Sequence, residues 1–245
     1  MTDEKAVDRE IRQILLDPHL LQVLQGQRND YGDLRLKYTL DKLSYGGEIA
    51  RSFGFDETVT QAIQIIHDLS RSRFGGVGEA FLLAVDERCT RSFYAAQLAK
   101  KLLRAVDSPK VPAIRDGAAR TVLEQHRTAE EMIVCILEYC FAFADSLKER
   151  DTALLLRMRY KDLIIEKTAA AGRLTRHEIP ENTIPKREKP AFPEEEPERR
   201  RAVLQQEYQR YLAHPEEIPE AFRNGWDGLE ERLIAAFYVA GQPEE

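Results

Sequence analysis

The sequence predicts an all-α protein. Apolar residues recur at the three- and four-residue spacing of amphipathic helices along most of the chain, and no useful length of sequence alternates apolar and polar residues as a strand would. Residues suited to helix ends stand between these stretches. Gly54 is placed to end one helix, and Asp56 is placed to cap the next. These observations favour a bundle of helices over a fold that contains a sheet.

The predicted helices follow one another with short interruptions. The first is expected to break near Asp17 and Pro18, and residues 26–32 are expected to form a loop. Three glycines within residues 70–78 predict a second loop directly after His67 and Asp68. Further helices are expected at residues 40–53, 59–66, 79 onward, 91–106, 114–126, 128–149, 151–171, 198–213 and 226–240.

Composition divides the chain into three parts. Proline, glutamate and lysine dominate residues 176–198, and such a segment cannot bury enough apolar surface to pack, so we expect a linker there. A chain of 245 residues can form a core without disulfides or metals. We therefore expect a helical core over residues 1–175, followed by the linker. A C-terminal helical segment over 199–245 should pack back on the core.

Charge and hydropathy exclude several classes of protein. No apolar run approaches the roughly 18 residues that a membrane span needs, and the charged N-terminus does not resemble a secretory signal, so a cytoplasmic protein without membrane contact is expected. The net charge of -6 argues against a general nucleic-acid binder, although it leaves local basic patches open. Cys89, Cys135 and Cys140 form no CxxC pair and are expected to be ordinary core thiols.

The most specific pattern lies at residues 47–82, which read GEIARSFGFDETVTQAIQIIHDLSRSRFGGVGEAFL. This segment resembles the dGTP triphosphohydrolase branch of the HD superfamily, whose corresponding helix ends in an HDLGHPPFGHxGE-like run. The preceding RLKYTLDK, at residues 35–42, resembles the RxTHSLEV element of that family. Fainter echoes lie at 92–103 and 214–245. The resemblance implies an HD-domain helical bundle, a dNTP-like nucleotide as ligand, and a homo- or hetero-oligomer.

The resemblance also implies a divalent metal (Mn, Mg, Fe or Ni) held by two histidines and two aspartates. His67 and Asp68 are the remnant of this set, while Tyr38 stands where the first histidine would be. A tyrosine with a pKa of about 10 is mostly protonated at neutral pH and is a weak ligand. For the last aspartate, both Asp145 and Asp151 remain open. Either a weakly held metal or no metal at all is expected.

The positions that serve the chemistry of active relatives are also changed. Arg71 and Gly76 replace the loop histidines, the segment 92–103 contains no histidine, and Phe237 replaces an aspartate in the closing helix. Because the loop histidines of relatives are candidates for general acid or base work, their loss, together with the other changes, predicts that chemistry of the family's type is impaired. No catalytic residue is therefore assigned.

Four basic residues are candidates for binding a nucleotide's phosphates: Arg35, Lys37, Arg71 and Arg73. The alternative is that they are solvated surface side chains. The nearby glycines would allow a ligand to approach the backbone closely, or would simply shape a turn. Aromatic residues at helical spacing are expected to fill the core, and the scattered histidines to lie at the surface or cap helices. These are Phe93, Tyr139, Phe141 and Phe143, and His19, His126, His177 and His214.

Three functions are consistent with these features. The first is a non-catalytic HD-type protein that binds nucleotide or protein, as a regulatory subunit or a sensor. The second is a metal-dependent (deoxy)nucleotide phosphohydrolase with a site rebuilt around His67 and Asp68. The third is a helical scaffold for protein contacts, with the linker clasping a partner. Metal content and nucleotide turnover discriminate between them.

Overall fold

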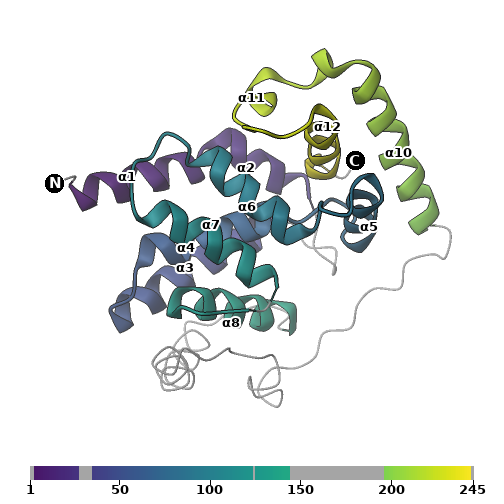
Figure 1. Cartoon of the computed structure of the whole chain (residues 1–245). Helices are drawn as coiled ribbons and strands as arrows, with labels where there is room; N and C mark the ends of the chain where they lie inside the picture. The colour runs from purple at the N-terminus through teal and green to yellow at the C-terminus, as the bar shows by residue number, and fades with distance from the viewer. Residues whose placement is uncertain (1–2, 28–34, 124, 144–195, 244–245) are drawn as a thin grey trace.

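The computed structural model describes residues 3–27, 35–123, 125–143 and 196–243, and its regular structure there is entirely helical (Figure 1). The predicted all-α class is confirmed for these residues. None of the described helices is both long and apolar enough to cross a bilayer. The helices are α1 (Glu4–Leu15), α2 (Pro18–Gln25), α3 (Arg35–Phe53), α4 (Glu57–Leu69), α5 (Gly76–Val85), α6 (Arg91–Leu102), α7 (Lys110–Val122), α8 (Ala129–Phe143), α10 (Glu196–Ala213), the 3-10 helix η3 (Pro215–Glu217), α11 (Glu220–Arg223) and α12 (Glu231–Gly241).

Helix α4 lies at the centre of the bundle. It contacts α1, α3, α6, α7 and α8, and almost every residue along it is buried. Its start follows the predicted signals: Gly54 has a φ of 76°, and the carboxylate of Asp56 accepts the Val59 N–H at 2.9 Å. A helix that is covered on all sides belongs to the interior of a fold. This burial extends to the last turn of α4, so the polar residues His67 and Asp68 lie inside the bundle.

The C-terminal helices form a second group beside this bundle, drawn in green and yellow in Figure 1. Helices α10 and α12 pack on each other and on α5. The ring of Phe237 on α12 stacks on Tyr94 of α6, with ring centroids 4.3 Å apart. The backbone N–H of Arg73 donates to the carbonyl of Ala240 at 2.7 Å. The C-terminal segment is thereby attached to the loop that follows α4.

Several helices begin elsewhere than the sequence predicts. Helix α3 starts at Arg35 rather than residue 40, because its buried face there carries polar side chains that apolar periodicity does not detect. Helix α12 starts at Glu231 rather than 226, because Gly225 and Gly228 both have positive φ and form a turn before it. Helix α5 starts at Gly76, three residues before its predicted beginning. Helix α10 begins at Glu196, inside the predicted linker.

The predicted helix at 151–171 and residues 176–195 lie outside the described residues, so the division into three parts stays a prediction. Of the predicted core residues, Phe141 and Cys89 are buried, and Phe93 and Cys135 are partly buried against the core. The side chains of Tyr139, Cys140 and Phe143, and all of His177, lie outside the described part.

Two of the remaining histidines, His19 and His214, are exposed as predicted. The prediction for His126 was wrong. It follows α7 and lies completely buried, and neither of its ring nitrogens has a hydrogen-bond partner in the described structure. A loop residue is buried by the helices around it, and this packing leaves no periodic signal in the sequence.

Candidate functional site

The end of α4 places a histidine and a carboxylate side by side in a buried polar cluster. The side chains of His67 and Asp68 are only 5% and 1% exposed. Glu138, from α8, joins them, and ligand atoms of the three residues all lie within 4.8 Å of one another. A histidine with two carboxylates at this separation is a donor set that suits a divalent transition metal. The three residues therefore form a possible metal-binding cluster.

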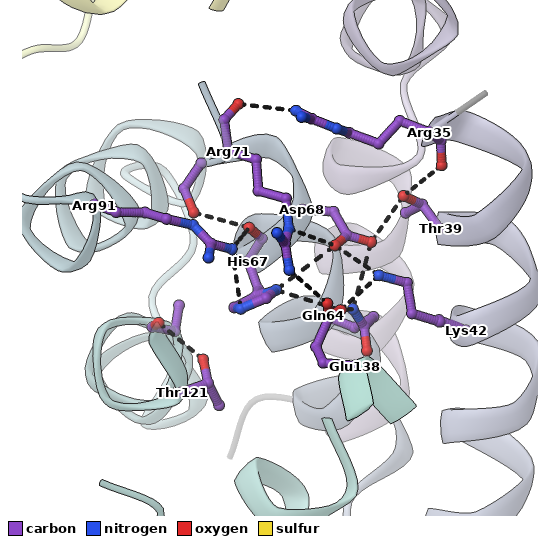
Figure 2. A network of polar contacts seen from close by, with 12 residues as sticks. Arg35, Thr39, Lys42, Gln64, His67, Asp68, Arg71, Arg91, Thr121 and Glu138 are labelled. Carbon is purple, nitrogen blue, oxygen red and sulfur yellow. Dashed lines mark hydrogen bonds and ion pairs between the residues drawn. The ribbon is translucent and has the colours of Figure 1, made fainter. Parts of the chain in front are cut away.

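A lysine occupies the space between the two carboxylates. The ammonium of Lys42, from α3, lies 2.8 Å from Asp68 Oδ1 and 2.5 Å from Glu138 Oε1 (Figure 2). The other oxygen of Asp68 accepts a hydrogen bond from Thr39 at 2.8 Å. Gln64 and Arg71 donate to Glu138 at 2.6 and 2.7 Å. The two carboxylates together thus accept from cationic, amide and hydroxyl donors on α3, on α4 and in the loop after α4.

These contacts keep both carboxyl groups ionised. Burial is the largest single influence on the pKa of Asp68 and raises it, but the ammonium of Lys42 and the imidazole of His67 together leave this pKa below its usual value. Glu138 behaves similarly: burial raises its pKa, while Lys42 and the neighbouring cations lower it well below the usual range. The cluster is therefore a set of buried ion pairs at neutral pH.

The imidazole of His67 contacts an arginine at the start of helix α6. Arg91, the first residue of α6, donates from Nη2 to the His67 carbonyl at 2.9 Å and lies 3.0 Å from its Nε2. Because a guanidinium only donates hydrogen bonds, Nε2 acts as the acceptor in this contact, which places the ring proton on Nδ1. Nδ1 faces the carboxylates, 3.4 Å from Glu138 and 3.6 Å from Asp68.

This arrangement does not fit a bound metal. A metal needs a free lone pair from each ligand, whereas one imidazole lone pair is used by Arg91 and the other nitrogen carries the proton. The two carboxylates already face Lys42. A divalent cation would have to displace both cationic side chains. No chemical step through a metal is therefore derived.

The sequence-predicted phosphate-binding residues lie in different surroundings. Arg71 is partly exposed at the edge of the cluster, and the guanidinium of Arg35 donates to its carbonyl at 3.1 Å. Arg35 is buried and also donates to Gln27 at 2.6 Å. Arg73 points away toward α10, where it pairs with Glu207 at 2.6 Å. Lys37 is exposed on α3.

The glycine loop turns on itself. Phe74 and Gly75 both have positive φ, and a Cβ at Gly78 would collide with the carbonyl of Arg73 and the side chain of Ser72. The close approach that this glycine permits is therefore to the loop's own backbone. Of the two roles considered for the loop glycines, close approach of a ligand or shaping of a turn, Gly78 has the second.

Sequence reasoning missed the carboxylate that joins His67 and Asp68, which is Glu138. It also missed the two cations that contact these three residues, Lys42 and Arg91. One signal was available for Glu138, because it is the one charged residue in the apolar stretch from Met132 to Phe143 and such a charge is costly unless paired. Asp145 and Asp151, the two candidates for a last ligand, lie outside the described residues. Tyr38, which stands where the family's first histidine was expected, lies one helical turn before Lys42 on α3. The centroid of its ring is 5.7 Å from that of Phe141.

Comparison with known proteins adds a partial relationship. No protein-family model matches the chain. Deoxyguanosinetriphosphate triphosphohydrolase-like proteins are similar to it: that of Geobacter metallireducens is 38% identical over 61 residues, and that of Nitrobacter hamburgensis is 36% identical over 64. A third, from Jannaschia sp., is 34% identical over 67 residues.

The matches cover 25–27% of this chain and only 16–17% of the relatives' own length. These short matches therefore do not show that this chain has the activity, substrates or partners of a whole relative. HD-domain membership stays a prediction. Over about a quarter of its length, the chain is related to deoxyguanosinetriphosphate triphosphohydrolase-like proteins.

Proposed function

We propose that this chain is a non-catalytic relative of deoxyguanosinetriphosphate triphosphohydrolase-like proteins that binds a nucleotide through its phosphates, as a sensor or regulatory subunit. The observation that carries the proposal is that cationic side chains contact the polar groups of the cluster. Its histidine and carboxylates are engaged by Lys42, Arg71 and Arg91, so no group is left to activate a water molecule. Binding, rather than hydrolysis, is what such a site supports.

The ligand class follows from Arg91. Its only hydrogen bonds in the described structure are to His67, no described carboxylate lies within 4 Å of it, and its Nε is buried without a partner. Burial, with the positive charge of Arg71 nearby, lowers the pKa of Arg91 to about 9. A guanidinium in this position gains from an anion, and phosphate oxygens match its geometry. The partly exposed Arg71 offers a second positive charge for the phosphates, and the exposed Lys37 on α3 offers a third.

Replacing Arg91 tests this function. In excess EDTA, the native chain should bind a dNTP without hydrolysing it, and Arg91→Met should weaken binding about ten- to a hundredfold, the value of one or two charged hydrogen bonds. Isothermal titration with dGTP and the other dNTPs measures the affinities. Arg115→Met is the matched control, because Arg115 is an exposed arginine paired with its neighbour Asp116 at 2.8 Å.

Equal affinity of the Arg91→Met and native chains would contradict the proposed ligand contact. If no nucleotide bound to the native chain, the protein-binding alternative would replace nucleotide binding. The alternative enzyme, a metal-dependent (deoxy)nucleotide phosphohydrolase, is favoured by the proximity of His67, Asp68 and Glu138. It predicts hydrolysis in added Mn²⁺ that is lost in His67→Ala.

A further inference from the structure

The position of Lys42 in the cluster resembles that of a bound cation. Carboxylates from two helices, Asp68 on α4 and Glu138 on α8, converge on its ammonium from 2.8 and 2.5 Å. The lysine side chain is only 7% exposed, so little of it faces solvent. Figure 2 shows Lys42 reaching from α3 into the space between the other two helices. One positive charge thus links the side chains of three helices.

Arg91 completes the replacement on the histidine side. Its guanidinium engages Nε2 of His67 at 3.0 Å, and thereby directs the proton of the ring toward the carboxylates. A proton on Nδ1 repels a cation in the cluster and prevents that nitrogen from acting as a ligand. The three possible ligands are therefore blocked in two independent ways, one for the carboxylates and one for the imidazole.

We propose that Lys42 and Arg91 are built-in cations that take the place of a divalent metal at the His67–Asp68–Glu138 cluster, so that the cluster is a latent metal site. This inference adds to the proposed function, since it explains how the cluster remains folded without a metal. Two buried carboxylates side by side need a compensating charge. A lysine on a neighbouring helix supplies it permanently, whereas a metal can dissociate.

Removing the built-in charges should therefore create metal binding. Lys42→Met keeps the length and apolar stem of the side chain but removes the cation that lies between Asp68 and Glu138, and leaves only Arg71 at the edge of the pair, 2.7 Å from Glu138. The variant should take up about one equivalent of Mn²⁺ per chain, where the native chain takes up none. Adding Arg91→Met frees Nε2 to carry the ring proton and Nδ1 to act as a ligand. The double variant should bind Co²⁺ and Zn²⁺, which accept imidazole, more tightly than Lys42→Met does.

The experiment measures metal content after equilibrium dialysis, together with the thermal midpoint with and without metal. Metal should raise the midpoint of Lys42→Met and leave that of the native chain unchanged, because a ligand that binds only the folded state stabilises it. Lys37→Met is the matched control, since Lys37 is an exposed lysine on the same helix. Adding Asp68→Asn to Lys42→Met should abolish the gain.

The outcomes separate this inference from the proposed function. Lys42→Met that folds but takes up no more metal than Lys37→Met would overturn the inference and leave nucleotide binding intact. The same conclusion would follow if neither Lys42→Met nor Lys42→Gln folded in the presence of metal, since the proposal requires that a metal can replace the ammonium. Stoichiometric metal in the native chain would overturn it as well. Dialysis in dGTP and EDTA tests the proposed function separately.

Discussion

Replacing Asp68 with alanine should lower the free energy of unfolding by about 3–5 kcal/mol, the usual cost of removing one partner of a buried ion pair. The carboxylate is 1% exposed and accepts from Lys42 and Thr39, both at 2.8 Å. Without it, Lys42 and Arg71 would both depend on Glu138 as the remaining carboxylate of the cluster. A loss of this size is a large part of the roughly 5–15 kcal/mol that stabilises a typical domain.

Urea unfolding followed by circular dichroism measures this effect. Asp107→Ala is the control, because Asp107 is exposed and should change stability by less than about 0.5 kcal/mol. The double variant Lys42→Met/Asp68→Asn should be less destabilised than the sum of the two single variants, since it removes both charges together. A cost for Asp68→Ala close to that of Asp107→Ala would contradict the ion-pair description of the cluster.

Acidification should destabilise the chain through His126 before it protonates the carboxylates. Burial lowers the pKa of this histidine to about 4, from 6.5 for an accessible one, and the charge of Glu131 offsets only part of that effect. The unfolded chain therefore binds the proton more readily than the folded chain. The stability that the neutral ring supplies is fully present above pH 6.5 and is lost as the pH falls toward 4. The full difference corresponds to about 3 kcal/mol, of which about 2 kcal/mol is lost by pH 5.

The variant His126→Leu removes the titrating group and keeps an apolar side chain in its place. Its stability should change much less than that of the native chain between pH 7 and 5, as measured by urea unfolding at each pH. His19→Leu is the control, because His19 is exposed and should leave the pH dependence unchanged. Parallel curves for the native chain and His126→Leu would show that His126 is not the group responsible.

The sequence predicts the helix that carries the site better than it predicts the site. Helix α4 is marked by the cap of Asp56, by Gly54 before it and by a continuous apolar face, and these signals are local. The cluster depends on contacts between residues far apart in the chain. Lys42 and Glu138 are 96 positions apart, and nothing in the sequence around either residue indicates that they meet.

The family resemblance did not point to Glu138 as a neighbour of His67 and Asp68. The aspartates considered for the last ligand, Asp145 and Asp151, lie outside the described residues, and the structure brings Glu138 to the cluster from α8. Arg91 was overlooked because arginine at the start of a helix is common on protein surfaces. Only the fold shows that its guanidinium turns inward to His67, at 2.9 Å from the carbonyl oxygen. Arg35 and Arg73, which the sequence offered as phosphate-binding residues or as solvated surface side chains, are both buried.

The most direct test of the account is metal analysis and dNTP turnover on one preparation of the native chain. Lys42 and Arg91 engage the groups that a metal would need. We therefore predict less than about 0.1 equivalent of bound Mn²⁺, Mg²⁺, Fe²⁺ or Ni²⁺ after dialysis. The same preparation should bind dGTP in EDTA and form no product when Mn²⁺ is added. One equivalent of metal, together with dGTP hydrolysis that His67→Ala abolishes, would contradict the account and identify the chain as a metal-dependent phosphohydrolase.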